Sequence, residues 1–87
     1  MPYIDRDSRT KFKEPIKALW DLIGTDGELN YVITMLAINF VDKQGGDTYS
    51  NIGRALMAME MAKLEFYRRK AAAYEQLKSL QNGDVYG

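Results

Sequence analysis

The sequence has no cysteine and no histidine. Without cysteine, the chain can form neither disulfides nor thiolate metal sites. Without histidine, it lacks the commonest metal ligand and the commonest acid–base group near neutral pH. The serines, Ser8, Ser50 and Ser79, fall at predicted helix ends or exposed positions, where capping is a better interpretation than nucleophilic catalysis. We therefore expect no cofactor, no metal site and no enzymatic activity.

An excess of one charge and long apolar runs are also absent. Twelve basic residues balance twelve acidic ones, so the chain lacks the positive field that non-specific nucleic-acid binding needs. No apolar run approaches the length of a membrane span. The N-terminal residues also lack the basic and apolar regions of a signal peptide. These features predict a cytoplasmic protein with no membrane partner.

The sequence does contain enough apolar residues for a core. Its 87 residues, 46% of them hydrophobic, indicate one folded domain rather than a disordered chain. Small domains without disulfides or metals gain stability from regular helix packing or from oligomerisation. Helix packing and oligomerisation are therefore the sources of stability that remain for this chain.

Apolar residues recur at spacings of three and four, which predicts an all-α fold. Pro15 suits the first position of one helix, Thr25 with Glu28 forms a capping box for the next, and Gly45-Gly46 ends that second helix. We expect these two helices to form a hairpin packed against one long C-terminal helix. The predicted elements are a short N-terminal arm over 1–13, helices over 15–23, 26–43 and 50–81, and a tail over 82–87.

The long C-terminal helix has a pattern that a single chain does not explain. Residues spaced by three and four from Ile52 to Leu80 form a heptad seam, and Lys63 and Lys70 interrupt it. Lysines are costly to bury without a partner. We therefore expect a homo-oligomer in which Lys63 and Lys70 meet glutamates of another chain or an anionic ligand.

Lysine and tyrosine also alternate along this helix. The candidate ligand-binding residues are Lys63, Tyr67, Lys70 and Tyr74, at spacings of four, three and four, with Arg68 and Arg69 beside them. Lysine and arginine bind phosphate groups, and a tyrosine ring offers a face on which a base can stack. The stripe is thus a candidate site for an anionic nucleotide. The alternative is a solvated amphipathic face whose lysine stems and tyrosine rings pack on neighbouring helices.

The start of the second helix is another candidate. Amide groups at a helix N-terminus and the positive end of the helix dipole attract anions. Asn30 and Tyr31 follow this start and lie away from the main apolar stripe of the helix. They could complete a ligand site from another chain, or the segment could simply be a well-capped helix start.

Three motifs occur together in this chain. They are GELNYVIT over residues 27–34, AKLEFYRR over residues 62–69 and NGDVY over residues 82–86. In this order and spacing they resemble a family of small proteins from phages and bacteria that is labelled a domain of unknown function. The resemblance covers nearly the whole chain and implies a phage context, but the label carries no activity.

That context suggests a function by analogy, because small phage-encoded helical proteins without catalytic residues commonly act by binding. We expect a non-catalytic, homo-oligomeric sponge that sequesters an anionic nucleotide immune signal in the host cytoplasm, as a means of counter-defence. One alternative is a protein–protein interaction module or an inhibitor of a host or phage enzyme. Another is a small accessory subunit in phage nucleotide or DNA metabolism.

Overall fold

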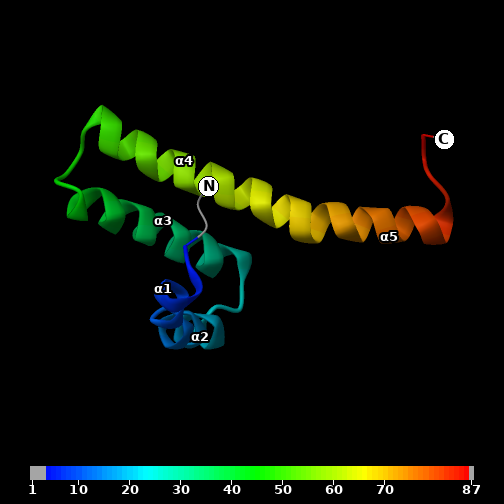
Figure 1. Ribbon diagram of the computed structural model, residues 1–87, viewed down its shortest axis with the longest axis horizontal. Coiled ribbons are helices and arrows are strands. Elements are labelled where there is room, and N and C mark those ends of the chain that lie inside the picture. Colours follow the sequence, from blue (N-terminus) through cyan, green and yellow to red (C-terminus); the bar gives the residue numbers. More distant parts are fainter. Residues whose placement is uncertain (1–3, 87) are drawn as a thin grey trace. The chain divides into compact units, whose positions relative to one another are not determined.

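A computed structural model describes residues 4–86, which form helices joined by short turns, with no strand in that range (Figure 1). The prediction of an all-α fold with a long C-terminal helix is confirmed for these residues. Residues 1–3 of the predicted arm and residue 87 of the predicted tail lie outside the described range. The elements are α1 (Arg6–Thr10), α2 (Lys13–Leu22), α3 (Asp26–Lys43), α4 (Tyr49–Phe66), the π-helical η1 (Tyr67–Ala71) and α5 (Ala72–Asn82).

The predicted N-terminal arm contains a short helix, α1. Asp5 begins it, since its Oδ1 accepts a hydrogen bond from the Ser8 amide at 2.8 Å. This hydrogen bond favours the charged carboxylate and lowers the pKa of Asp5 below its ordinary value of 3.8. Within the described part of the arm, residues 6–10 are thus helical, because Asp5, three residues before Ser8, caps this helix.

The helix α2 begins at Lys13, two residues earlier than predicted, and Pro15 is its third residue. The first amides of a helix have no carbonyl partner, so a proline there loses no hydrogen bond. The Ile16 amide is the next along the chain, and it donates to the Phe12 carbonyl at 3.0 Å. The helix ends at Leu22, one residue earlier than predicted, because Ile23 has an extended backbone.

Both ends of α3 are where the sequence predicts them. The Glu28 amide donates to Thr25 Oγ1 at 3.1 Å, and Glu28 Oε1 accepts the Thr25 amide at 3.1 Å, which confirms the capping box. At the other end, the Gly45 amide donates to the Asp42 carbonyl and the Gly46 amide to the Val41 carbonyl. This pair of bonds is a Schellman motif, and the φ of 115° at Gly45 explains the glycine.

The turn from α3 to α4 is held by side chains from the start of α4. Thr48 Oγ1 accepts the Asn51 amide at 3.0 Å and so caps α4. The Asn51 side-chain amide donates to the carbonyls of Gln44 and Gly46, at 3.3 Å and 3.0 Å. These bonds bring the first turn of α4 back onto the end of α3.

The helical conformation then continues without a break from Tyr49 to Asn82, and we call residues 49–82 the long helix. The prediction is a regular helix over residues 50–81. The observed helix departs from this prediction, because the π-helical η1 lies within it. Gly83, with a φ of 82°, ends it, and the Gly83 amide donates to the Ser79 carbonyl at 2.9 Å.

Very little of the chain is buried. The chain divides into two compact units, residues 1–55 and residues 56–87. In the first unit, among the described residues, only Val41 and Ala55 are buried, near the turn that joins α3 to α4. In the second unit, residues 56–86 include no buried residue. A core large enough to stabilise a domain is therefore absent from each unit by itself.

Candidate functional site

The long helix changes its hydrogen-bonding pattern where the predicted cations cluster. Residues 67–71 form a π-helical turn, after which the Ala72 amide donates to the Tyr67 carbonyl, five residues earlier. Such a turn holds one more residue than an α-helical turn. The segment contains neither proline nor glycine, so the extra residue lies within a continuous helix.

The extra residue divides the predicted lysine–tyrosine stripe. Each residue turns an α-helix by about 100° around its axis. Because η1 holds one extra residue, side chains after η1 are rotated around the axis by up to about 100° relative to an uninterrupted α-helix. The rotation brings Glu75 toward Tyr67, whose hydroxyl donates to Glu75 Oε2 at 3.4 Å. The prediction of one straight stripe from Lys63 to Tyr74 is wrong, because it assumed a regular α-helix.

Two of the predicted cations converge on one carboxylate. Arg68 Nη2 lies 2.8 Å and 2.9 Å from the two carboxylate oxygens of Glu65, and Arg69 Nε donates to Glu65 Oε1. The side chain of Glu65 is only 27% exposed, whereas those of Arg68 and Arg69 are each 64% exposed. Positions three and four apart on a helix face each other. Glu65 therefore orients both guanidinium groups and offsets one of their two charges.

The other predicted residues of the long helix have weaker partners. Lys63 Nζ lies 3.7 Å from Glu60 Oε1, and both side chains are exposed. Lys70 has no ion-pair partner among residues 4–86. The ring of Tyr74 lies beneath Lys78, whose Nζ is 5.6 Å from the ring centroid. Such exposed pairs contribute little to stability, so these side chains can change partners easily.

The η1 segment is therefore a positively charged stretch of helix surface. Arg68, Arg69 and Lys70 are consecutive, and the described contacts place the Glu65 carboxylate against Arg68 and Arg69. Guanidinium groups make paired hydrogen bonds to phosphate as well as to carboxylate. An anionic ligand could bind here by sharing or replacing the contacts to Glu65. Tyr67, which is exposed at one end of the segment, offers a flat apolar face.

The remaining two predicted residues lie on α3, in the first unit. Asn30 Oδ1 accepts a hydrogen bond from the Thr34 hydroxyl at 3.4 Å, one turn along the helix. Tyr31 lines an open, mostly apolar hollow of about 330 Å³, together with Leu19, Leu22, Ile23, Gly27, Glu28 and Val32. Leu19 and Leu22 of α2 make the surroundings of Tyr31 mostly apolar, and Glu28 adds a carboxylate, so these surroundings favour packing over recognition of an anion.

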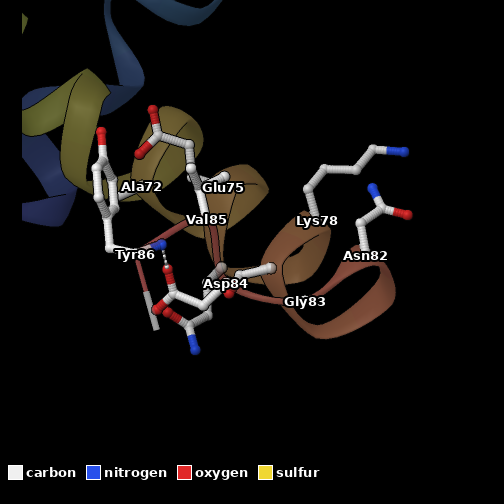
Figure 2. A pocket seen from close by; sticks show the side chains of 10 residues that line it. Ala72, Glu75, Lys78, Asn82, Gly83, Asp84, Val85 and Tyr86 are labelled. Atoms are coloured by element: carbon white, nitrogen blue, oxygen red, sulfur yellow. Dashed lines mark hydrogen bonds between the residues drawn. The ribbon is translucent and has the colours of Figure 1, made fainter.

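A second hollow lies where the C-terminal tail runs beside α5. It has a volume of about 650 Å³ and is open to solvent (Figure 2). The Tyr86 amide donates to Asp84 Oδ1 at 2.8 Å, which bends the tail. Lys78 and Asn82 point away from the Tyr86 ring in Figure 2. Val85 and Tyr86 remain almost fully exposed, so the tail makes few contacts that would close this hollow.

Sequence reasoning missed the contacts that two acidic residues of the site make within the chain. The role of Glu65 as an anchor for Arg68 and Arg69 follows from its spacing of three and four, which is visible in the sequence. The contact between Tyr67 and Glu75 spans eight residues and depends on η1. No pattern of spacing in the sequence indicates that contact.

The described residues contain no group of three or more histidine, cysteine, aspartate or glutamate side chains placed to hold a metal ion. No helix among them is long and apolar enough to cross a membrane. Their buried side-chain nitrogen and oxygen atoms all have hydrogen-bond partners.

The fold and the site define a small all-α protein with a basic π-helical turn in its longest helix. The chain belongs to the family described as "Domain of unknown function (DUF6899)", which matches residues 1–85. This confirms the resemblance to a family of unknown function that the three motifs indicate. No curated protein and no solved structure matches the chain.

Proposed function

We propose that this chain is a non-catalytic binding protein that acts as a homo-oligomer, and that its helices are the surfaces on which copies associate. The observation that carries the proposal is the contrast between a sequence that is 46% hydrophobic and a structure in which very few residues are buried. Among the described residues only Val41 and Ala55 are buried, whereas large apolar side chains are exposed on every helix from α2 to α5.

The first unit supports this proposal through α3. Helices that are apolar on all sides are buried in larger cores. The stripe Leu29, Ile33, Leu36 and Phe40 covers one side of α3, while Tyr31, Met35 and Ile38 recur on the opposite side. One neighbouring helix covers only one side, so α3 needs a partner on the other side.

The second unit supports it more simply. Residues 56–82 are a single helical segment, and a helix alone has nothing on which to bury its apolar side chains. Phe66 is 67% exposed and Leu80 is 76% exposed. Fully burying such a side chain contributes about 1.5–3 kcal/mol relative to leaving it in water. A few of them from each copy would offset the cost of association, which is about 4–15 kcal/mol.

The molar mass in solution tests this proposal. Light scattering and sedimentation should give a whole-number multiple of the 10.0 kDa chain mass, maintained on dilution to low micromolar concentration. Circular dichroism should lose its helical signal in the same concentration range in which the assembly dissociates. A helical monomer of 10.0 kDa at all concentrations would refute the proposal.

An anionic nucleotide is the second candidate for what the assembly binds. The observation that favours it is the run of three consecutive cations in η1, with Arg68 and Arg69 held by Glu65 and Tyr67 exposed beside them. In a homo-oligomer, copies of this segment could combine into one phosphate-binding surface. A phage protein of this kind would act in the host cytoplasm by sequestering a nucleotide immune signal.

Calorimetry tests the nucleotide candidate directly. A panel of cyclic dinucleotides, cyclic trinucleotides and cyclic ADP-ribose isomers should contain at least one ligand that Arg69→Ala or Lys70→Ala weakens by more than tenfold. Lys17→Ala is the matched control, because Lys17 is an exposed cation on α2 with only Asp21 as its partner, at 3.5 Å. Absence of heat with every member of the panel would remove this candidate while leaving the oligomer proposal intact.

A further inference from the structure

The helix α3 carries a second heptad seam that is distinct from the one on the long helix. Its members follow one another at spacings of three, four, three, four and three: Asp26, Leu29, Ile33, Leu36, Phe40 and Lys43. We call these six residues the α3 seam. All of α3 from Asp26 to Lys43 is regular α-helix, so the α3 seam stays on one side of the helix for its whole length.

Three of the four apolar residues of the α3 seam are exposed, among the residues that the structure describes. Leu29, Ile33 and Leu36 are 48%, 44% and 58% exposed. Phe40 is half-buried, with the guanidinium carbon of Arg54 5.5 Å from its ring centroid. At the ends of the seam, neither Asp26 nor Lys43 has an ion-pair partner among residues 4–86.

The α3 seam is complementary to itself when reversed. Asp26 and Lys43 are equally far from the midpoint between Thr34 and Met35, and so are the pairs Leu29 with Phe40 and Ile33 with Leu36. When two copies of α3 pack antiparallel about that midpoint, Asp26 of one copy meets the partner subunit's Lys43. The other two pairs meet across the contact in the same way. The charged ends then meet residues of opposite sign, and four apolar side chains per copy meet one another.

A parallel arrangement has the opposite consequence. Parallel heptad seams place each residue against its own counterpart, so Asp26 would meet Asp26 and Lys43 would meet Lys43. Like charges at such positions oppose association. Antiparallel packing also aligns the two helix dipoles favourably. Both electrostatic effects therefore select the antiparallel arrangement.

We propose that α3 is the contact between two copies of this chain, which pack antiparallel along the α3 seam with Asp26 of one copy beside the partner subunit's Lys43. The inference rests on the proposed homo-oligomer and specifies which face and which register form it. The occupant of the α3 seam is thus a second copy of the same chain, related to the first by a two-fold axis that crosses the seam at the level of the midpoint between Thr34 and Met35.

Disulfide trapping tests the register, because the chain has no cysteine of its own. Chains with Asp26→Cys and chains with Lys43→Cys are co-expressed, oxidised and analysed by mass spectrometry. These substitutions leave the four apolar seam residues in place. A disulfide needs Cα atoms within about 7 Å of each other. In the antiparallel register, thiols at residue 26 of both copies are about 25 Å apart along the axis, so only the mixed disulfide should form.

The matched control moves one thiol to the neighbouring residue. Asp42→Cys lies at nearly the same level as Lys43 but about 100° around α3, away from the seam. Co-expressed with Asp26→Cys, it should give at least tenfold less mixed disulfide than Lys43→Cys gives. Equal trapping of the two would overturn the proposed face, and self-disulfides of Asp26→Cys alone would overturn the antiparallel direction.

The same samples separate this inference from the proposed function. If light scattering shows an oligomer but no mixed disulfide forms, the α3 seam is not the contact and the homo-oligomer stands. If the chain is a monomer, both proposals fail. Circular dichroism of each variant shows whether α3 is still folded.

Charge reversal provides a second measurement that does not depend on trapping. Asp26→Lys and Lys43→Glu should each weaken association by about tenfold, because the two ion pairs of each dimer become contacts between like charges. The double variant Asp26→Lys/Lys43→Glu should recover to within about threefold of the parent chain, although its end charges oppose the helix dipole. Additive loss in the double variant would contradict the register.

Discussion

Two heptad seams run along this chain, and only one of them stays on a single face. The α3 seam lies on a helix whose hydrogen bonds are α-helical from end to end, so its spacing in the sequence is also its arrangement in space. The seam of the long helix, from Ile52 to Leu80, passes through η1 and is rotated there by one extra residue. Its lysines at 63 and 70 interrupt it further.

This difference shows what a spacing pattern can and cannot predict. Residues at intervals of three and four share a face only while the helix holds 3.6 residues per turn. In α3 the capping box and the Schellman motif set both ends, and nothing alters the turns between them. In the long helix no end lies near η1, so no capping signal marks the change. The α3 seam is therefore the better candidate for a contact between copies.

The largest effect we expect comes from a charge in the middle of the α3 seam. Leu36→Glu would place a carboxylate against the partner subunit's Ile33, where burial without a partner costs several kcal/mol. The association constant should fall by more than about 100-fold, and a chain with so little core of its own should lose much of its helical structure on dissociation. Sedimentation with circular dichroism in parallel measures both changes.

Thr34→Glu is the matched control for that substitution. Thr34 is an exposed residue of α3 that lies off the α3 seam, and its hydroxyl contacts only Asn30 one turn away. The same added charge should change the association constant by less than about threefold there. If both variants dissociated equally, the effect would belong to helix charge in general and not to the α3 seam.

A deletion in the long helix tests whether η1 holds one extra residue. Removing Ala71 should convert the π-helical turn to α-helix, because it removes the one extra residue that this turn holds. The side chains of α4 and α5 should then point in the same directions relative to one another as before. Removing Ala62 from the regular part of α4 should instead rotate all later residues by about 100°. We expect the first variant to keep its oligomeric mass and helical signal and the second to lose whatever association the long helix contributes.

One outcome of the deletions would contradict the presence of an extra residue in η1. If the long helix were a regular α-helix, losing either alanine would rotate the later residues by the same angle, and the two variants would behave alike. Thermal unfolding monitored by circular dichroism and molar mass by light scattering distinguish these cases. The two alanines are chemically identical, so a difference between the variants reports their position.

Much of the fold follows from local residues. Thr25, Glu28 and the Gly45-Gly46 pair determine both ends of α3, which lie where the approximate prediction over residues 26–43 places them. The observed boundaries of α2 differ from the predicted ones by one or two residues. The first amides of a helix have no carbonyl partner within it, so Pro15 fits at more than one of these positions and does not fix the first residue. Ends of helices are thus predictable where a side chain satisfies a backbone group.

The candidate site is less predictable, because its geometry depends on η1. The residues of η1 are ordinary helix formers, and neither glycine nor proline distinguishes them from the helix around them. The grouping of Arg68 and Arg69 on Glu65 follows from spacing, whereas the contact of Tyr67 with Glu75 does not. The extent of burial is not predictable from composition either, because burial depends on tertiary packing. Only two of the described residues of the chain are buried.

Loss of the α3 cap should have a moderate effect. Thr25→Ala removes the hydroxyl that accepts the Glu28 amide and should lower the free energy of unfolding by about 1 kcal/mol. Thr48→Ala removes the corresponding bond of α4 to the Asn51 amide and should have a similar cost. Chemical denaturation at a fixed chain concentration measures both. A different loss of unfolding free energy in the two variants would show that the caps of α3 and α4 contribute unequally. The capping box of α3 includes the reciprocal bond to Glu28, which the Thr48 cap lacks.

The smallest effect we expect is a dependence of α3 on acidic pH. The amide of Gly24 donates to Glu28 Oε1 at 2.9 Å, and this bond, with that from Thr25, holds the pKa of Glu28 below its ordinary value of 4.5. Because the folded pKa is the lower one, the contribution of Glu28 is fully present above about pH 4.5 and is lost as the pH falls through the folded pKa.

Glu28→Gln keeps a side-chain oxygen for the capping box but cannot titrate. The difference in unfolding midpoint between parent and Glu28→Gln chains should therefore stay constant from pH 7 to about pH 5 and shrink below that. A difference that is the same at pH 3 and pH 7 would mean that the charge of Glu28 contributes nothing to the start of α3.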